Sequence, residues 1–138
     1  MLQALVVGLA MAAAMTDAPA APPPAPIVFF DIAGVDGARQ AAFYRDVFGW
    51  QSGPTGALSV PVLGSALPGT LRKDPTDKII YIGVDDVSAT LARVQAHGGK
   101  IVQPRFEVKG VVVLGLFADP AGNSMGLVEM RAGKPKVP

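Results

Sequence analysis

Apolar and polar positions follow two rhythms along the chain, and these rhythms occur in the same order twice. Residues 27–50, IVFFDIAGVDGARQAAFYRDVFGW, begin with a β-branched and aromatic run and continue with apolar residues at helical spacing. This pattern predicts a strand followed by an amphipathic helix. Asp36 is suited to cap the helix at its start, and Gly49 is suited to end it. The Gly and Pro residues within 51–77 then favour strands and turns over a second long helix.

The second stretch, residues 79–101, repeats this plan with IIYIGVDDVSATLARVQAHGGKI. Asp85, Asp86 or Ser88 can cap its helix, and the two glycines after His97 can end it. The segments KIVQPRFEV and VVVLGLFA that follow are rich in residues that favour strands. DPAG then predicts a type I turn, and SMGLVEM predicts the strand that returns from it.

The two stretches can be aligned with each other. Placing Ile32 on Val84 also places Phe29 on Tyr81, so both halves follow one pattern. Each half has about 50 residues, which is too few to bury a core alone. We therefore expect an α+β fold in which each half is a strand, a helix and three further strands, and the two sheets share one concavity.

Three segments together carry a family resemblance: FFDIAGVDGARQAAFYRDVFGW, YIGVDDVSATLARVQAHGGKIVQP and DPAGNSMGLVEM. In this order they resemble the vicinal oxygen chelate superfamily, which includes glyoxalases, bleomycin-resistance proteins and extradiol dioxygenases. The resemblance covers essentially all of residues 27–130. It implies two βαβββ modules that form a curved, open-barrel sheet around a cavity with the helices outside, and it implies a homodimer.

Composition excludes several classes of function. A chain of 138 residues with 50% apolar and 17% charged residues suits a single folded domain. The net charge of +1 and the lack of a basic stripe argue against nucleic-acid binding. The chain has no cysteine, which excludes disulfides, zinc–thiolate sites and thiol nucleophiles. His97 is the one histidine, so one chain cannot supply a site with two or three histidines.

The two ends of the chain differ in composition from the domain. Residues 1–26 are expected to be a signal-like or disordered segment with a proline-rich linker, and residues 132–138 a solvated tail. The domain is therefore expected at 27–131. The apolar N-terminal run is too short for a stable membrane span, which needs about 20 residues. A signal peptide would make the protein periplasmic or secreted, whereas translation from Met15 would make it cytoplasmic.

The resemblance also implies where a metal would be held. Metal-containing members place ligands on the first, fourth, fifth and eighth strands of the sheet. Here the first and fifth positions are Phe29 and Tyr81, and only the eighth-strand glutamate is kept, as Glu129. Three or four converging ligands are needed for a strong divalent-cation site, so we expect no metal and no other cofactor. Thr70 or Arg72 could come from the fourth strand, where Arg72 would suit an ion pair with Glu129.

Strand alternation predicts which side chains line the cavity. Anchoring the alternation on Phe29 and Tyr81 gives a cavity face of Ile27, Phe29, Asp31, Ile79, Tyr81, Gly83, Met125, Leu127 and Glu129. The residues between them, Val28, Phe30, Ile32, Ile80, Ile82 and Val84, are expected under the helices. The predicted ligand-binding residues are Phe29, Asp31, Tyr81, Gly83, Met125, Leu127 and Glu129. Such a lining, apolar with a few polar points, is typical of a small-molecule pocket.

The sequence leaves three functions open. The first is a glyoxalase- or bleomycin-resistance-like domain that binds a small organic molecule without a metal. The second is a lyase or isomerase in which Glu129, desolvated beside Tyr81, acts as general base and both residues are catalytic. The third is a degenerate fold retained for protein interaction. Two other interpretations of Glu129 are exposure at the cavity rim and neutralisation by Arg105 or Arg72.

Overall fold

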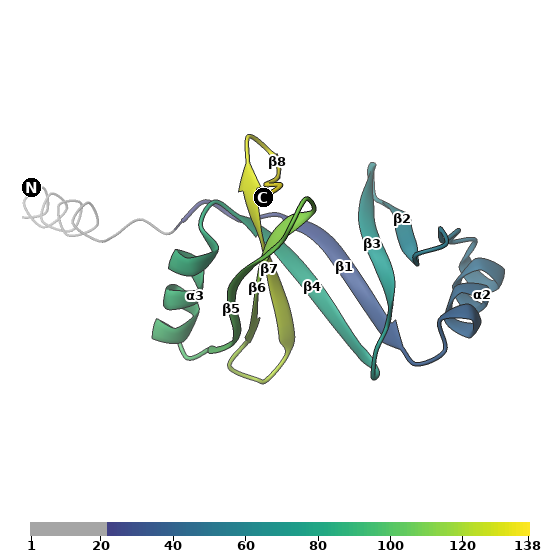
Figure 1. Ribbon diagram of the computed structural model, residues 1–138, viewed down its shortest axis with the longest axis horizontal. Coiled ribbons are helices and arrows are strands. Elements are labelled where there is room, and N and C mark those ends of the chain that lie inside the picture. Colours follow the sequence, from purple (N-terminus) through teal and green to yellow (C-terminus); the bar gives the residue numbers. More distant parts are fainter. Residues whose placement is uncertain (1–21) are drawn as a thin grey trace, which may run out of the picture.

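The two sequence repeats form the two halves of one mixed β-sheet, and each half carries one helix (Figure 1). The computed structural model describes residues 22–138. Its elements are β1 (Ile27–Gly34), α2 (Gly37–Phe48), β2 (Ala57–Val62), β3 (Ser65–Lys73), β4 (Asp77–Val84), α3 (Val87–Ala96), β5 (Lys100–Val108), β6 (Val112–Ala118), β7 (Ser124–Arg131) and β8 (Lys134–Pro135). The predicted α+β class is confirmed, and α2 and α3 lie toward opposite ends of the sheet.

The strands follow the order β2-β3-β1-β4-β7-β6-β5, and β8 pairs with β7 outside this path. The first strands of the two halves, β1 and β4, pair antiparallel where the halves join. The second half has the predicted strand, helix and three further strands. The first half has one strand fewer, because residues 49–56 form none. Gly53 and Pro54 in this segment favour turns, and a proline has no N–H to donate to a ladder.

Both helices begin at residues that the sequence predicted. Asp36 caps α2 by accepting the N–H of Arg39 at 3.0 Å. Asp86 caps α3 by accepting the N–H of Ala89 at 2.9 Å. Gly49 ends α2 with a φ of 71°, a conformation that glycine adopts at no steric cost. Each leading strand therefore passes directly into a capped helix.

The two helices are packed to different depths. α3 buries Val87 and Leu91, which lie against Leu127 of β7. No residue of α2 is buried, and its Ala41 and Tyr44 only partly cover the first half of the sheet. The second half is thus the better packed of the two around its helix.

We call the side of the sheet that carries α2 and α3 the helix face, and the opposite side the open face. Phe30 and Ile32 of β1 belong to the cluster that packs with α2, and Ile82 and Val84 of β4 pack with α3, as the alternation predicted. The open face has its own apolar cluster, which comprises Val28, Phe29, Ile79, Tyr81, Val112, Leu114, Leu116, Val128 and Met130.

A bulge near the start of β1 reverses two predicted orientations. The register with β4 shifts between Ile27 and Phe29, so that Ile27 pairs with Ile82 of the helix face while Phe29 pairs with Tyr81. Ile27 was predicted to face the cavity and Val28 to pack under the helix, and both predictions are wrong. The extra residue of a bulge breaks the strict alternation on which they depended.

The C-terminal segment, expected to be a solvated tail, is mostly exposed and also pairs with the domain. Residues of β8 pair with Met130 and Arg131 of β7, and the N–H of Lys136 donates to the carbonyl of Glu129 at 2.8 Å. At the other end, the Gly83 N–H donates to the carbonyl of Pro26 at 2.9 Å, which attaches the proline-rich segment to β4. The signal-peptide prediction and the alternative start at Met15 concern residues outside the described range.

Candidate functional site

The main polar cluster of the open face lies where β1, β3 and β4 run side by side. The hydroxyl of Tyr81 donates to Asp31 Oδ2 at 2.7 Å, and Arg72 Nη2 donates to Asp31 Oδ1 at 3.2 Å. Asp74 accepts from Nη1 of the same arginine at 3.0 Å. Asp31 is only 2% exposed, so its carboxylate depends on these donors to replace water.

Charge and burial tune this cluster. Burial, and then the hydrogen bond to Asp31, raise the pKa of Tyr81, so its hydroxyl stays protonated and remains a donor at neutral pH. Burial opposes the charge on Arg72, but its bonds to Asp74 and Asp31 outweigh this effect and raise the pKa of the guanidinium. The Arg72 Nε atom is buried and has no hydrogen-bond partner within residues 22–138. The cluster therefore holds a permanent cation with one unsatisfied donor.

Apolar side chains surround the cluster. The edge of the Phe29 ring meets Tyr81 with 5.5 Å between the ring centroids. Tyr81 in turn packs directly on Gly126, where a Cβ atom would overlap its ring. Gly83 shares this face but is covered by Val28 and Met130. Of the predicted ligand-binding residues, the fold thus brings Phe29, Asp31, Tyr81 and Gly83 to the open face.

The predicted orientation of the last strand is wrong. β4 and β7 pair in parallel, with Tyr81 opposite Gly126, Ile82 opposite Leu127 and Val84 opposite Glu129. Met125, Leu127 and Glu129 therefore lie on the helix face, away from Tyr81. Glycine and apolar residues occur at both alternating sets of positions in β7, among them Gly126 and Val128. The sequence of β7 therefore shows no alternation of polar and apolar residues that would fix its register.

Glu129 is held on the helix face by three kinds of donor. Arg105 donates to it twice, from Nε at 3.0 Å and from Nη2 at 2.9 Å. The backbone N–H of Val87, at the start of α3, donates at 3.1 Å, and Lys136 Nζ donates at 3.3 Å. Of the interpretations considered from sequence, this arrangement matches neutralisation by Arg105. Arg72, the other suggested partner, binds Asp31 instead.

This environment decides the charge of Glu129. The hydrogen bonds from Arg105 lower its pKa to about 2, although burial acts in the opposite direction. Glu129 does not lie desolvated beside Tyr81 as the general-base hypothesis required, because Tyr81 is on the other face and the neighbours of Glu129 are cations. A carboxylate with such a low pKa is a weak proton acceptor at neutral pH.

The positions where the resemblance places metal ligands do not fit a divalent cation. Phe29 and Tyr81 stand opposite each other in the β1–β4 ladder and present rings, and Glu129 points to the other face. Nowhere between residues 22 and 138 do three His, Asp or Glu side chains come together in a group that could hold a metal. Over the same range, no helix is long and apolar enough to cross a membrane.

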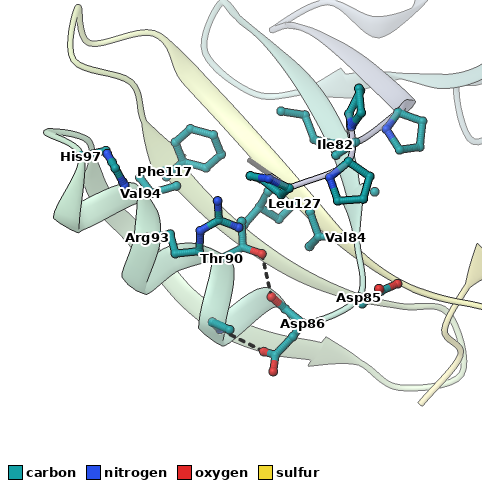
Figure 2. A pocket seen from close by; sticks show the side chains of 17 residues that line it. Ile82, Val84, Asp85, Asp86, Thr90, Arg93, Val94, His97, Phe117 and Leu127 are labelled. Carbon is teal, nitrogen blue, oxygen red and sulfur yellow. Dashed lines mark hydrogen bonds between the residues drawn. The ribbon is translucent and has the colours of Figure 1, made fainter. Parts of the chain in front are cut away.

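The helix face has two open grooves that the sequence did not reveal. One, of about 800 Å³, lies between the proline-rich segment and α3 (Figure 2). The other, of about 820 Å³, lies between Trp50 and the β6–β7 turn, over Phe30 and Ile80. Their walls come from segments distant in the chain, so no local motif marks them. The apolar pattern indicated only that these strand residues are buried.

Known proteins resemble this chain in sequence. The family model described as glyoxalase-like domain matches residues 27–128. A protein of Mycobacterium tuberculosis and Mycobacterium bovis with the provisional name glyoxylase CFP32 is 30% identical over 111 residues, covering 70% of this chain and 42% of that protein. The anthracycline biosynthesis protein DnrV of Streptomyces peucetius is 27% identical over 129 residues, covering 76% of this chain and 45% of DnrV. The chain thus spans less than half the length of these curated relatives.

Solved structures share the fold. Methylmalonyl-CoA epimerase in complex with methylmalonyl-CoA superimposes with a TM-score of 0.57 at 19% identity, covering 81% of this chain and 99% of that chain. A variant of the Streptomyces coelicolor epimerase in complex with 2-nitronate-propionyl-CoA gives 0.56 at 19% identity, covering 80% and 98%. At such identity the likeness concerns the fold alone. The family match over residues 27–128 shows that this chain belongs to the glyoxalase-like domain family of the vicinal oxygen chelate superfamily.

Proposed function

We propose that the domain binds a small organic molecule on its open face, without a metal. The observation that carries this proposal is the Asp31–Tyr81–Arg72 cluster within an apolar surface. The Arg72 side chain is 30% exposed, so it reaches solvent while Asp31 holds it in place. An oriented, partly exposed guanidinium beside aromatic and aliphatic groups suits a ligand with an apolar body and a carbonyl or carboxylate oxygen.

The names of the relatives agree with this ligand class. Methylmalonyl-CoA, which is bound in one structural relative, carries a carboxylate and a thioester carbonyl. Anthracyclines, named in another relative, are aromatic molecules with several carbonyl groups. Both kinds of molecule offer oxygen acceptors to Arg72 and flat or apolar surface to Phe29. These two molecules are therefore the first probes for this chain.

Titration calorimetry of the full chain with methylmalonyl-CoA and with an anthracycline tests the proposal. We expect one of them to bind, and we expect Arg72→Gln to weaken that binding about tenfold, since hydrogen bonds to charged groups are the strong ones. Arg39→Gln, at an exposed arginine of α2, is the matched control and should bind like the wild type. The proposal fails if neither probe binds, or if both arginine variants bind equally well.

The lyase or isomerase hypothesis now depends on a different carboxylate. Its support came from Glu129 beside Tyr81, and the two residues lie on opposite faces. Asp31 is the carboxylate that meets Tyr81, so we propose that any proton transfer on a bound carbon acid uses this pair. Loss of turnover in Asp31→Asn with binding kept would support this role. If the Asp31→Asn variant still turned over the ligand, Asp31 would have no role in proton transfer.

The exposed aromatic end of α2 supports the proposed homodimer. Phe43 is 50% exposed and Phe48 is 60% exposed, and Tyr44 and Trp50 stack beside them. The curated relatives are more than twice as long as the part that this chain matches, which leaves room for a second such unit in each of them. A second copy of this chain would supply that unit here. Light scattering should show a dimer that Phe48→Ser converts to a monomer, and a monomeric wild type would contradict it.

A further inference from the structure

The groove between the proline-rich segment and α3 lies apart from the open face. Its floor is apolar and is formed by Ile82, Val84, Leu127 and Phe117 on the helix face of the second half (Figure 2). Its opposite wall is the proline-rich segment, which the Gly83–Pro26 hydrogen bond attaches to β4. The volume of about 800 Å³ lies within the range of small-molecule sites, about 300–1,000 Å³.

Some charged side chains along this groove already have hydrogen-bond partners, and others do not. Asp86, at the start of α3, accepts the N–H of Ala89, so its carboxylate is used in capping the helix. Arg93 and His97, one turn apart toward the other end of α3, make no side-chain hydrogen bond or ion pair with any residue in 22–138. Figure 2 shows these two side chains along α3, across the groove from Val84. Asp85, which lines the groove near the start of α3, also makes no side-chain hydrogen bond or ion pair with residues 22–138. The groove therefore carries free charge of both signs, with the cation Arg93 toward the His97 end.

Several backbone carbonyls in the last turn of α3 are already hydrogen-bonded. Unpaired carbonyls at a helix C-terminus repel anions. Here the His97 N–H donates to the Arg93 carbonyl at 3.1 Å, and the Gly99 N–H donates to the Val94 carbonyl at 2.9 Å. The last turn is thus closed by backbone hydrogen bonds, and the Arg93 side chain remains available to a ligand.

We propose that this groove is a second binding site, which takes a small amphipathic organic acid. The apolar body of the ligand lies over Ile82, Val84 and Leu127, and its carboxylate binds Arg93, with His97 as a second donor. The site is separate from the one proposed on the open face, because β4 and β7 present Tyr81 and Val128 to that face and Ile82 and Leu127 to this one.

Titration of the full chain with decanoate and with decanol tests the proposal. The two probes share an apolar chain and differ in the carboxylate. We expect decanoate to bind about tenfold more tightly than decanol, and we expect Arg93→Gln to remove this difference. Arg39→Gln is the matched surface control and should preserve it. Ala89→Trp, which places a bulky ring in the groove at an exposed position of α3, should weaken the binding of both probes.

Two results would overturn the proposal. One is equal affinity for decanoate and decanol in the wild type, which would mean that no cation recognises the acid. The other is an unchanged preference for decanoate in Arg93→Gln, which would place the acid elsewhere. Tyr81→Phe separates the two sites, since it should leave decanoate binding intact while it alters the binding of the open-face probes. A loss of decanoate binding in Tyr81→Phe would assign the acid to the open face instead.

Discussion

Two buried carboxylates of this chain have similar partners and different surroundings. Asp31 is 2% exposed and Glu129 is 6% exposed, and each is paired with an arginine from another strand, Arg72 of β3 and Arg105 of β5. Glu129 accepts hydrogen bonds from Arg105, from Lys136 and from the backbone at the start of α3. These donors satisfy its charge and connect β5, β7, α3 and the C-terminal segment.

Asp31 has fewer hydrogen-bond donors than Glu129, although it is slightly more buried. Its donors are Tyr81 and Arg72, and the arginine keeps a buried Nε atom without a partner. The Asp31 cluster faces the open side of the sheet, whereas the Glu129 cluster lies against α3. A buried acid with an arginine partner is therefore not by itself a functional site. The donors of Glu129 belong to α3 and the C-terminal segment, so this carboxylate is structural. Asp31 shares an arginine that reaches the open face, so its cluster is a candidate ligand contact.

Glu129→Gln should produce the largest effect in this comparison. The amide cannot neutralise Arg105, and the donors around it lose a charged acceptor, so we expect the free energy of unfolding to fall by about 3 kcal/mol. Urea denaturation measures this change. Glu107→Gln is the control, because Glu107 is exposed and only meets Arg105 at 3.5 Å. A Glu129→Gln protein as stable as the control would show that the cluster contributes little.

Gly126→Ala should disturb the Asp31 cluster instead. The new methyl group would overlap the Tyr81 ring, so Tyr81 must shift from the position in which it donates to Asp31. Overpacking of this kind costs about 1–3 kcal/mol of unfolding free energy. Gly53→Ala is the matched control, since an added Cβ there meets no atom within 4 Å. An unchanged stability and an unchanged probe affinity in Gly126→Ala would mean that the position of Tyr81 is not fixed by this contact.

Acid should weaken the Glu129 cluster in a defined range. The pKa of Glu129 falls from 4.5 to about 2 on folding, so its contribution is complete above about pH 5 and is lost as the pH falls toward 2. Between pH 7 and pH 3 the wild type should lose about 1–2 kcal/mol more unfolding free energy than Glu129→Gln does. Parallel urea denaturation series at several pH values measure the difference. Equal losses in both proteins would contradict the low pKa.

Local features of the fold could be predicted from the sequence. Asp36 and Asp86 cap the two helices, and Gly49 ends the first, because capping depends on residues a few positions apart. The DPAG turn also forms, with the Gly122 N–H donating to the Asp119 carbonyl at 2.9 Å. Features that depend on pairing between strands could not be predicted from the sequence in the same way. One of them is the bulge between Ile27 and Phe29, which is defined by the register of β1 with β4.

The candidate site shows the same division. Alternation placed Asp31 and Tyr81 on one face, because β1 and β4 have a clear apolar side under the helices. It could not orient β7, where glycine and apolar residues occupy both faces, and so it placed Glu129 beside Tyr81. Nor could it identify Arg72 as the partner of Asp31, since that pair depends on the parallel register of β1 and β3. The grooves on the helix face carried no signal at all in the sequence.

The sequence by itself determined two capped helices, the repeated strand–helix plan, the family and the placement of Phe29, Asp31 and Tyr81 on one face of the sheet. These properties depend on propensity and spacing within short segments. The tertiary structure alone decided that Glu129 stabilises the start of α3 and that Asp31 meets Tyr81 and Arg72. A one-residue difference in strand register moves a side chain from one face of a sheet to the other, and only the neighbouring strands fix that register.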